Sequence, residues 1–158
     1  MSLDELIEKI REFKEKEKIN FETQEDLAVA IMHLISLEEH FYFTYEKTKK
    51  EEYLDLIEKV RNIRKDAMTK IIKEPEGELW CCSKHILGAV YRFFEVGEKL
   101  FSEGKKDEAK SFYESAYELF NLFFGLKFNI IKVEDIKEIK EKNKLQQVIE
   151  KLIDCCNE

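Results

Sequence analysis

Residues that end helices are scarce in this chain, which has one Pro and five Gly among 158 residues. Charged residues make up 39% of the sequence, and most of them are Lys or Glu, which favour long helices. A chain of this length fits one domain, and such a domain buries roughly two-thirds of the surface that its unfolded chain exposes. The sequence therefore predicts a single all-α domain over residues 1–158, a bundle of five to six antiparallel helices.

The spacing of apolar residues indicates where these helices lie. Apolar residues recur three and four positions apart over about residues 2–16, 23–47, 51–73, 78–104, 107–126 and 133–156. Pro75 and Gly77 separate the third predicted helix from the fourth, and Thr23 is the predicted N-cap of the second. In the fourth helix, a rotation of about 100° per residue predicts a buried side with Cys82, Ile86, Ala89, Val90, Phe93, Phe94, Gly97, Leu100 and Phe101, and a polar stripe with Glu78, Cys81, His85, Gly88, Arg92, Glu95 and Lys99.

The overall charge and the length of the apolar runs argue against two classes of partner. The formal net charge is −7 and the basic residues form no cluster, so the sequence lacks the positive patch that nucleic-acid binding needs. No apolar run approaches the roughly 20 residues that span a bilayer, and the N-terminus has no basic and apolar signal-peptide regions. We therefore expect a cytoplasmic protein that has neither a membrane nor a nucleic acid as its partner.

Four Cys stand in two adjacent pairs, Cys81 with Cys82 and Cys155 with Cys156. This arrangement differs from the spaced framework of a small secreted domain, so reduced thiols are expected. The abundance of Lys and Glu and the small number of Gln and Asn are typical of thermophiles, in which intracellular disulfides do occur. A bridge such as Cys81 to Cys156 therefore stays open at this point.

Two residues of opposite charge interrupt the apolar faces of consecutive helices. Glu38 lies among Ile31, Leu34 and Tyr42 in helical spacing, and Arg64 lies at the centre of the apolar stripe of the next helix. The short link between the two helices makes them antiparallel neighbours, and a buried carboxylate needs a partner. The sequence therefore predicts a buried structural pair between Glu38 and Arg64.

Part of the chain resembles one tetratricopeptide repeat. The residues that carry the resemblance are Phe93, Val96, Gly97, Leu100, Gly104, Ala109, Tyr113 and Ala116. The resemblance covers Phe93 to Ala116, about one repeat, and implies a helical hairpin in which small residues let two antiparallel helices approach closely. The whole chain also resembles uncharacterised all-helical prokaryotic proteins that share the Glu-Gly-Glu-x-Trp-Cys and Lys-His segments, and this second resemblance implies no activity.

The polar stripes of the second and fourth helices contain the residues that could carry chemistry. Zn²⁺ ligands are available in His33, His40, Cys81 and His85, but His33 and His40 are about 10 Å apart along their helix and cannot both bind one ion. A site that uses only one of these His also needs Glu39, Glu78 or a terminal Cys, and the candidate metal set is His40, Cys81 and His85 with Glu39. The same residues are suited to ordinary hydrogen bonds between helices. A purely structural role is therefore a second interpretation beside zinc binding.

Two further interpretations involve the same region. Cys81 lies one turn before His85 and near a helix N-terminus, where a thiol becomes more acidic, which suggests a nucleophile, although no oxyanion hole or orienting acid is apparent. Alternatively, Lys84, His85 and Arg92 converge with Arg61 or His40 on a phosphate or carboxylate. We assign no catalytic residue, and we keep a metal- or thiol-dependent enzyme centred on His33, His40, Cys81 and His85 as the alternative.

The leading hypothesis is a non-enzymatic module that binds a protein or a small ligand. Its predicted groove lies between the second and fourth helices and contains His33, His40, Cys81, Lys84, His85 and Arg92. The fifth helix is unusually rich in aromatic residues for one small core, which suggests a homodimer. These aromatic residues are Phe112, Phe120, Phe123 and Phe124, with Phe128 just beyond.

Overall fold

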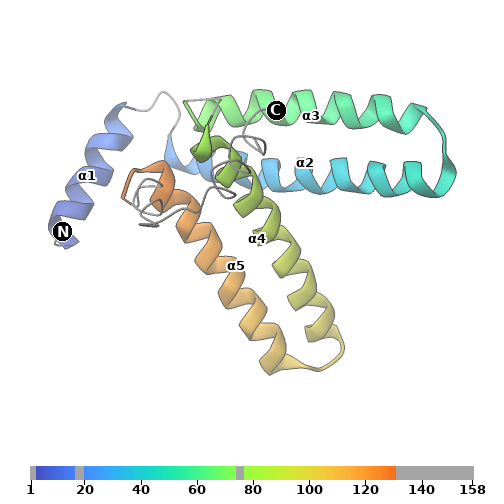
Figure 1. Cartoon of the computed structure of the whole chain (residues 1–158). Coiled ribbons are helices and arrows are strands. Elements are labelled where there is room, and N and C mark those ends of the chain that lie inside the picture. Colours follow the sequence, from blue (N-terminus) through green and yellow to red (C-terminus); the bar gives the residue numbers. More distant parts are fainter. Residues whose placement is uncertain (1–2, 17–19, 74–76, 131–158) are drawn as a thin grey trace, which may run out of the picture.

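The computed structural model describes residues 3–16, 20–73 and 77–130, and every regular element in these ranges is an α-helix. The helices are α1 (Leu3–Lys16), α2 (Phe21–Thr48), α3 (Glu52–Ile71), α4 (Glu78–Ser102) and α5 (Lys106–Lys127) (Figure 1). The all-α prediction is confirmed, and the helix boundaries agree with the apolar spacing to within a few residues. The sixth helix predicted over 133–156 lies outside the described residues.

The packed body consists of two helical hairpins, α2–α3 and α4–α5, which meet where α2 contacts α4. Figure 1 shows the two hairpins diverging from this crossing, with α1 to one side of both. Among the described residues four helices form the two packed hairpins, fewer than the five to six antiparallel helices predicted for the bundle.

The distribution of buried residues explains why the hairpins diverge. The buried residues of α2 lie only between Gln24 and Met32, and those of α3 lie only between Val60 and Ile71. The outer part of this hairpin therefore has no fully buried side chain to hold it against α4. Because burial of apolar surface drives helix packing, the two hairpins associate at the crossing and separate beyond it.

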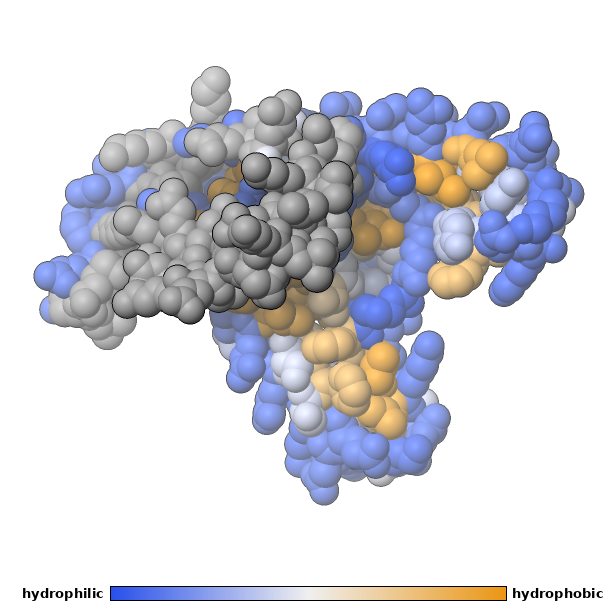
Figure 2. All heavy atoms as spheres, in the orientation of Figure 1, coloured by the Kyte–Doolittle hydropathy of each residue, from blue (hydrophilic) through white to orange (hydrophobic). Residues whose placement is uncertain are grey.

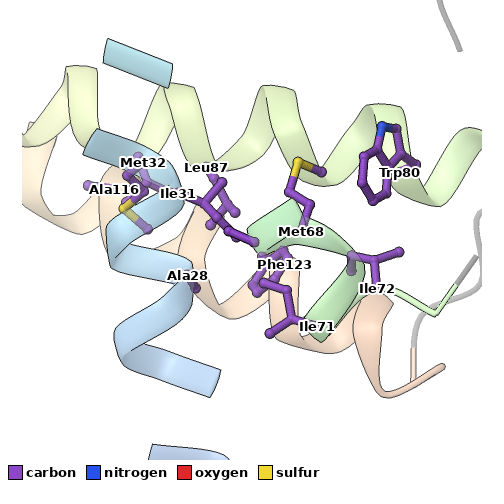
Figure 3. Close-up of a cluster of buried hydrophobic side chains, with 12 residues drawn as sticks. Ala28, Ile31, Met32, Met68, Ile71, Ile72, Trp80, Leu87, Ala116 and Phe123 are labelled. Carbon is purple, nitrogen blue, oxygen red and sulfur yellow. The ribbon is translucent and has the colours of Figure 1, made fainter. Parts of the chain in front are cut away.

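The hydrophobic core is concentrated at this crossing (Figure 3). Ile31 of α2, Met68 of α3, Leu87 of α4 and Phe123 of α5 are all 0% exposed, and Trp80 is 2% exposed. Each such side chain contributes about 1.5–3 kcal/mol relative to an exposed one. One residue from each of the four helices thus meets in the same core.

The start of α2 differs from the sequence prediction in its capping residue. The side-chain oxygen of Asn20 accepts a hydrogen bond from the backbone N–H of Thr23 at 2.8 Å. The prediction of Thr23 as the N-cap is therefore wrong, because Asn20 already satisfies the N–H group that opens the helix.

The α4–α5 hairpin is closely packed at its small residues. A Cβ atom at Gly97 would lie 2.6 Å from Cε1 of Tyr113, so only glycine allows this ring to lie against α4. Ala109 and Ala116 of α5 are 0% and 7% exposed. Gly104 has a φ of 80° in the connection, where glycine is favoured. A close hairpin therefore exists at the segment that resembles a tetratricopeptide repeat, while the relationship to that family stays a prediction.

The aromatic residues at the end of α5 pack against other aromatic rings of the same chain. The ring of Phe124 lies 5.0–5.1 Å from the rings of Phe21, Phe120 and Phe123 and 5.8 Å from that of Phe128. These residues therefore form no exposed surplus, because the start of α2 covers the end of α5. The exposed apolar side chains lie elsewhere, as Figure 2 shows over both hairpins, and include Tyr42, Phe43, Ile63, Phe94, Phe101 and Tyr117.

Among the described residues, we find no helix whose length and apolar character would let it span a membrane.

Candidate functional site

A polar pocket of about 470 Å³ lies where α2, α3 and α4 meet, and we call it the inner pocket. Each of the three helices contributes charged side chains to its wall, while Gly88 and Ala89 of α4 leave room for the cavity. The lining residues are Ile35, Glu38, Glu39, Arg61, Arg64, Lys84, His85, Gly88, Ala89 and Arg92.

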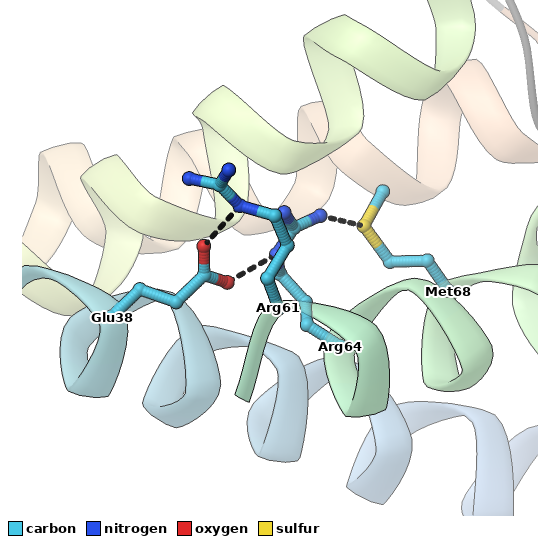
Figure 4. A network of polar contacts seen from close by, with 4 residues as sticks. All are labelled: Glu38, Arg61, Arg64 and Met68. Carbon is cyan, nitrogen blue, oxygen red and sulfur yellow. Dashed lines mark hydrogen bonds and ion pairs between the residues drawn. The ribbon is translucent and has the colours of Figure 1, made fainter. Parts of the chain in front are cut away.

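Glu38 binds two arginines of α3 in this pocket (Figure 4). Its Oε1 accepts a hydrogen bond from Nε of Arg64 at 2.6 Å, and its Oε2 accepts one from Nε of Arg61 at 3.3 Å. The Arg64 side chain is 1% exposed and that of Glu38 is 14% exposed, whereas Arg61 is 53% exposed. The predicted pair of Glu38 and Arg64 is therefore present, and Arg61 extends it toward solvent.

Glu39 makes the equivalent connection to α4. Its Oε2 accepts a hydrogen bond from Nη2 of Arg92, which also lies 3.4 Å from the Ser36 hydroxyl. Both members of this pair are about half exposed. The pair ties α2 to α4 at the solvent-facing edge of the inner pocket.

A second polar pocket of about 310 Å³ begins on the other side of this pair, and we call it the outer pocket. It shares Glu39 and Arg92 with the inner pocket, so the two pockets adjoin each other at these residues. Its lining residues are Ser36, Glu39, His40, Phe43, Thr44, Lys47 and Arg92.

The charge of the inner pocket is opposite to that of the chain. Among the described residues its lining has four cationic side chains (Arg61, Arg64, Lys84 and Arg92) and two carboxylates, although the whole chain has a formal net charge of −7. Guanidinium groups alone outnumber carboxylates by three to two. In a partly desolvated cavity such an excess favours an anion.

The structure brings together some of the predicted site residues and separates others. Lys84, His85 and Arg92 line the inner pocket with Arg61, as the anion-pocket interpretation requires, and His40 lines the adjoining outer pocket. His33 is in neither. It lines an apolar groove of about 540 Å³ between α2, α4 and α5, where its ring lies 4.9 Å from that of Tyr91.

Cys81 also lies away from both polar pockets. It is 4% exposed, whereas Cys82 is half-buried and its Sγ lies 3.5 Å from a carboxylate oxygen of Glu78. The sequence had placed Cys81 on the polar stripe and Cys82 in the core, and the structure reverses the two. The reason is that Trp80, Ser83 and Leu87 define the buried side of α4, which turns Cys81 inward.

The geometry for a zinc site is not formed by the described residues. Within residues 3–16, 20–73 and 77–130, no three His, Cys, Asp or Glu side chains lie where they could hold one metal ion. In particular, His40, Cys81, His85 and Glu39 do not gather in one place. Cys155 and Cys156 lie outside the described residues.

Sequence reasoning did not identify Glu39 as the partner of Arg92 or Ser83 as a core residue. Ser83 is 0% exposed, and its hydroxyl has no hydrogen-bond partner among the described residues. The role of Glu39 could have been predicted from its position next to Glu38. Consecutive residues of a helix point about 100° apart, so the two side chains contact different neighbouring helices.

Comparison with protein-family models, with curated proteins and with solved structures gives no match. The functional argument therefore rests on the two pockets.

Proposed function

We propose that this chain is a non-enzymatic binding module that takes a small anionic ligand, a carboxylate or a phosphate, in the inner pocket. The observation that supports this most directly is the excess of guanidinium groups over carboxylates in the pocket wall. Arginine binds carboxylate and phosphate in a bidentate manner and stays charged at all physiological pH values.

Arg61 and Arg92 are the residues that would contact the ligand. Arg61 uses its Nε for Glu38, and its terminal Nη groups make no hydrogen bond recorded in the described part of the chain. Arg92 uses Nη2 for Glu39 and Ser36, and its Nε and Nη1 make no hydrogen bond to another described residue, so they can donate to a ligand. Both side chains are about half exposed, so an anion can reach them from solvent.

The two glutamates would hold these arginines in place before the ligand arrives. Glu38 fixes Arg61 and the buried Arg64, and Glu39 fixes Arg92. Holding a long side chain in its binding geometry reduces the entropy that is lost on binding. His85, which is exposed at the pocket wall, adds a further hydrogen-bond donor when it is protonated.

Titration calorimetry with inorganic phosphate and with acetate tests this proposal on the full chain. We expect saturable binding that weakens as salt is added, because the charges lie near the surface. Arg61→Gln should weaken binding, whereas Lys59→Gln should not, since Lys59 is an exposed residue of the same helix that lines neither pocket. Absence of binding by either anion, or equal binding by both variants, would overturn the proposal.

We place this function in the cytoplasm, in keeping with the expectation of reduced thiols, and we retain the homodimer as a prediction for solution studies.

A further inference from the structure

We propose that the ligand has two anionic groups and occupies both pockets at once, with Arg92 between the two groups. This inference rests on the proposed function of the inner pocket and specifies the ligand class more narrowly.

The first observation is that the two pockets adjoin each other. Arg92 and Glu39 line both of them, and the two side chains are 47% and 44% exposed. The pair therefore divides the two cavities, and neither of its side chains is buried. Arg92 can donate to an anion on either side of this divide through N–H groups that Glu39 does not use.

Each pocket also has a cation of its own. The inner pocket has Arg61 on α3, and the outer pocket has Lys47 in the last turn of α2. His40 and the Ser36 hydroxyl add polar groups to the outer pocket. The described lining of the outer pocket has two cations, Arg92 and Lys47, and one carboxylate, that of Glu39. This cavity therefore also favours an anion.

Both pockets also have apolar lining residues. Ile35, Gly88 and Ala89 line the inner pocket, and Phe43 lines the outer pocket with 51% of its surface exposed. A ligand with an anionic group at each end of a short hydrocarbon linker would meet a cation and apolar side chains in each pocket.

Linking the two anionic groups has a thermodynamic consequence. After the first group binds, the second binds at an effective concentration set by the linker, commonly in the mM range. A dianion of suitable length should therefore bind more tightly than two independent monoanions would. A linker that is too short cannot span the divide and should lose this gain.

Titration calorimetry on the full chain tests the inference with succinate, glutarate, adipate and pimelate against acetate and inorganic phosphate. We expect one or two of the dicarboxylates to bind about tenfold or more tightly than acetate. Lys47→Gln should remove this gain and weaken acetate binding in the outer pocket, while the Arg61-dependent binding of acetate in the inner pocket stays. Arg61→Gln should weaken both, and Lys59→Gln should change neither. All three residues are exposed, so circular dichroism should show the same helix content in every variant.

The outcomes separate the two proposals. If acetate or phosphate binds and depends on Arg61 but no dicarboxylate binds more tightly, the inference is wrong and the proposed function stands. A gain for dicarboxylates that survives Lys47→Gln also overturns the inference, because the second group would then lie outside the outer pocket. If no anion binds, both proposals are wrong.

Discussion

Glu38 and Glu39 are adjacent in the sequence, yet each binds an arginine of a different helix. Glu38 binds Arg64 of α3, and Glu39 binds Arg92 of α4. The two ion pairs differ in environment, because the first is almost fully buried and the second is about half exposed. Neighbouring residues of α2 thus join it to α3 within its own hairpin and to α4 of the other hairpin, through one buried and one exposed ion pair.

Breaking the buried pair should destabilise the protein strongly. Glu38→Gln removes the carboxylate that faces a buried guanidinium, and Arg64→Met removes the guanidinium that faces a mostly buried carboxylate. Losing one partner of a buried ion pair costs about 3–5 kcal/mol. We expect each single change to lower the free energy of unfolding by an amount of this order, measured by urea denaturation.

The double variant of Glu38→Gln and Arg64→Met should cost less than the sum of the two single changes, because neither charge is then left without the other. Additive costs would show that the two residues stabilise the fold independently. Glu39→Gln provides the matched control, since exposed pairs are worth about 0–1 kcal/mol and weaken with salt.

Gly97→Ala should destabilise the α4–α5 hairpin. The new Cβ would lie 2.6 Å from Cε1 and 2.8 Å from Cδ1 of Tyr113, so the ring or the helix must shift. Overpacking of this kind costs about 1–3 kcal/mol, partly offset by the roughly 1 kcal/mol that Ala gains over Gly in a helix. Thermal unfolding should show a lower midpoint for this variant.

Gly88→Ala is the control for this change, because its Cβ would lie 3.3 Å from Cγ2 of Ile35, a contact that a small adjustment relieves. It should be close to neutral or stabilising. Equal midpoints for the two variants would contradict the close approach of Tyr113 to α4.

Tyr113 should titrate above the usual range of a tyrosine. Its hydroxyl donates a hydrogen bond to Oε1 of Glu98 at 2.5 Å, and this bond, together with desolvation and the nearby negative charge, raises the pKa of Tyr113 above 10.0. Because the folded-state pKa is the higher one, the hydrogen bond stabilises the fold fully below about pH 10, and this contribution is lost as the pH rises through the folded-state pKa.

Ultraviolet absorbance titration of wild type and Glu98→Gln, each with and without Tyr113→Phe, measures this effect. We expect Glu98→Gln to lower the pKa of Tyr113. An unchanged titration curve would mean that Glu98 does not hold the phenol in its neutral form.

A homodimer remains an expected property, and sedimentation at two protein concentrations tests it. The aromatic residues of α5 that first suggested a dimer are buried or half-buried, so an interface would use exposed ones such as Phe94 and Tyr117, which are 47% and 68% exposed. Tyr117→Ser should then lower the average mass at the higher concentration. A single monomer mass at both concentrations would exclude self-association.

Sequence reasoning predicted the helices and the buried ion pair well, because both depend on local spacing. Glu38 and Arg64 are charged residues within apolar stripes on consecutive helices, and the structure joins them. The buried side of α4 was predicted less accurately. Phe94 and Phe101 continue a regular apolar stripe, yet they are about half exposed, whereas Trp80 and Leu87 are buried.

The crossing of the two hairpins accounts for this difference. An apolar stripe shows that a helix has a face to bury, but its partners decide which part is covered. At the start of α4, the end of α3 contributes Ile71 and Ile72, which are 3% and 2% exposed, and this part of the core draws Cys81 inward. Lys84, His85 and Arg92, which the sequence predicts to converge on an anion, lie on the side of α4 that stays open and line the inner pocket.

The confinement of the core to the crossing also has a mechanical consequence. Each hairpin extends from this one packed region as a rod, so a small rotation there moves the far end of the rod in proportion to its length. The inner pocket lies at the inside corner, where α2, α3 and α4 meet. A ligand bound to arginines of both α3 and α4 would act close to the axis of this rotation. Its binding would therefore change the distance between the tips of the two hairpins.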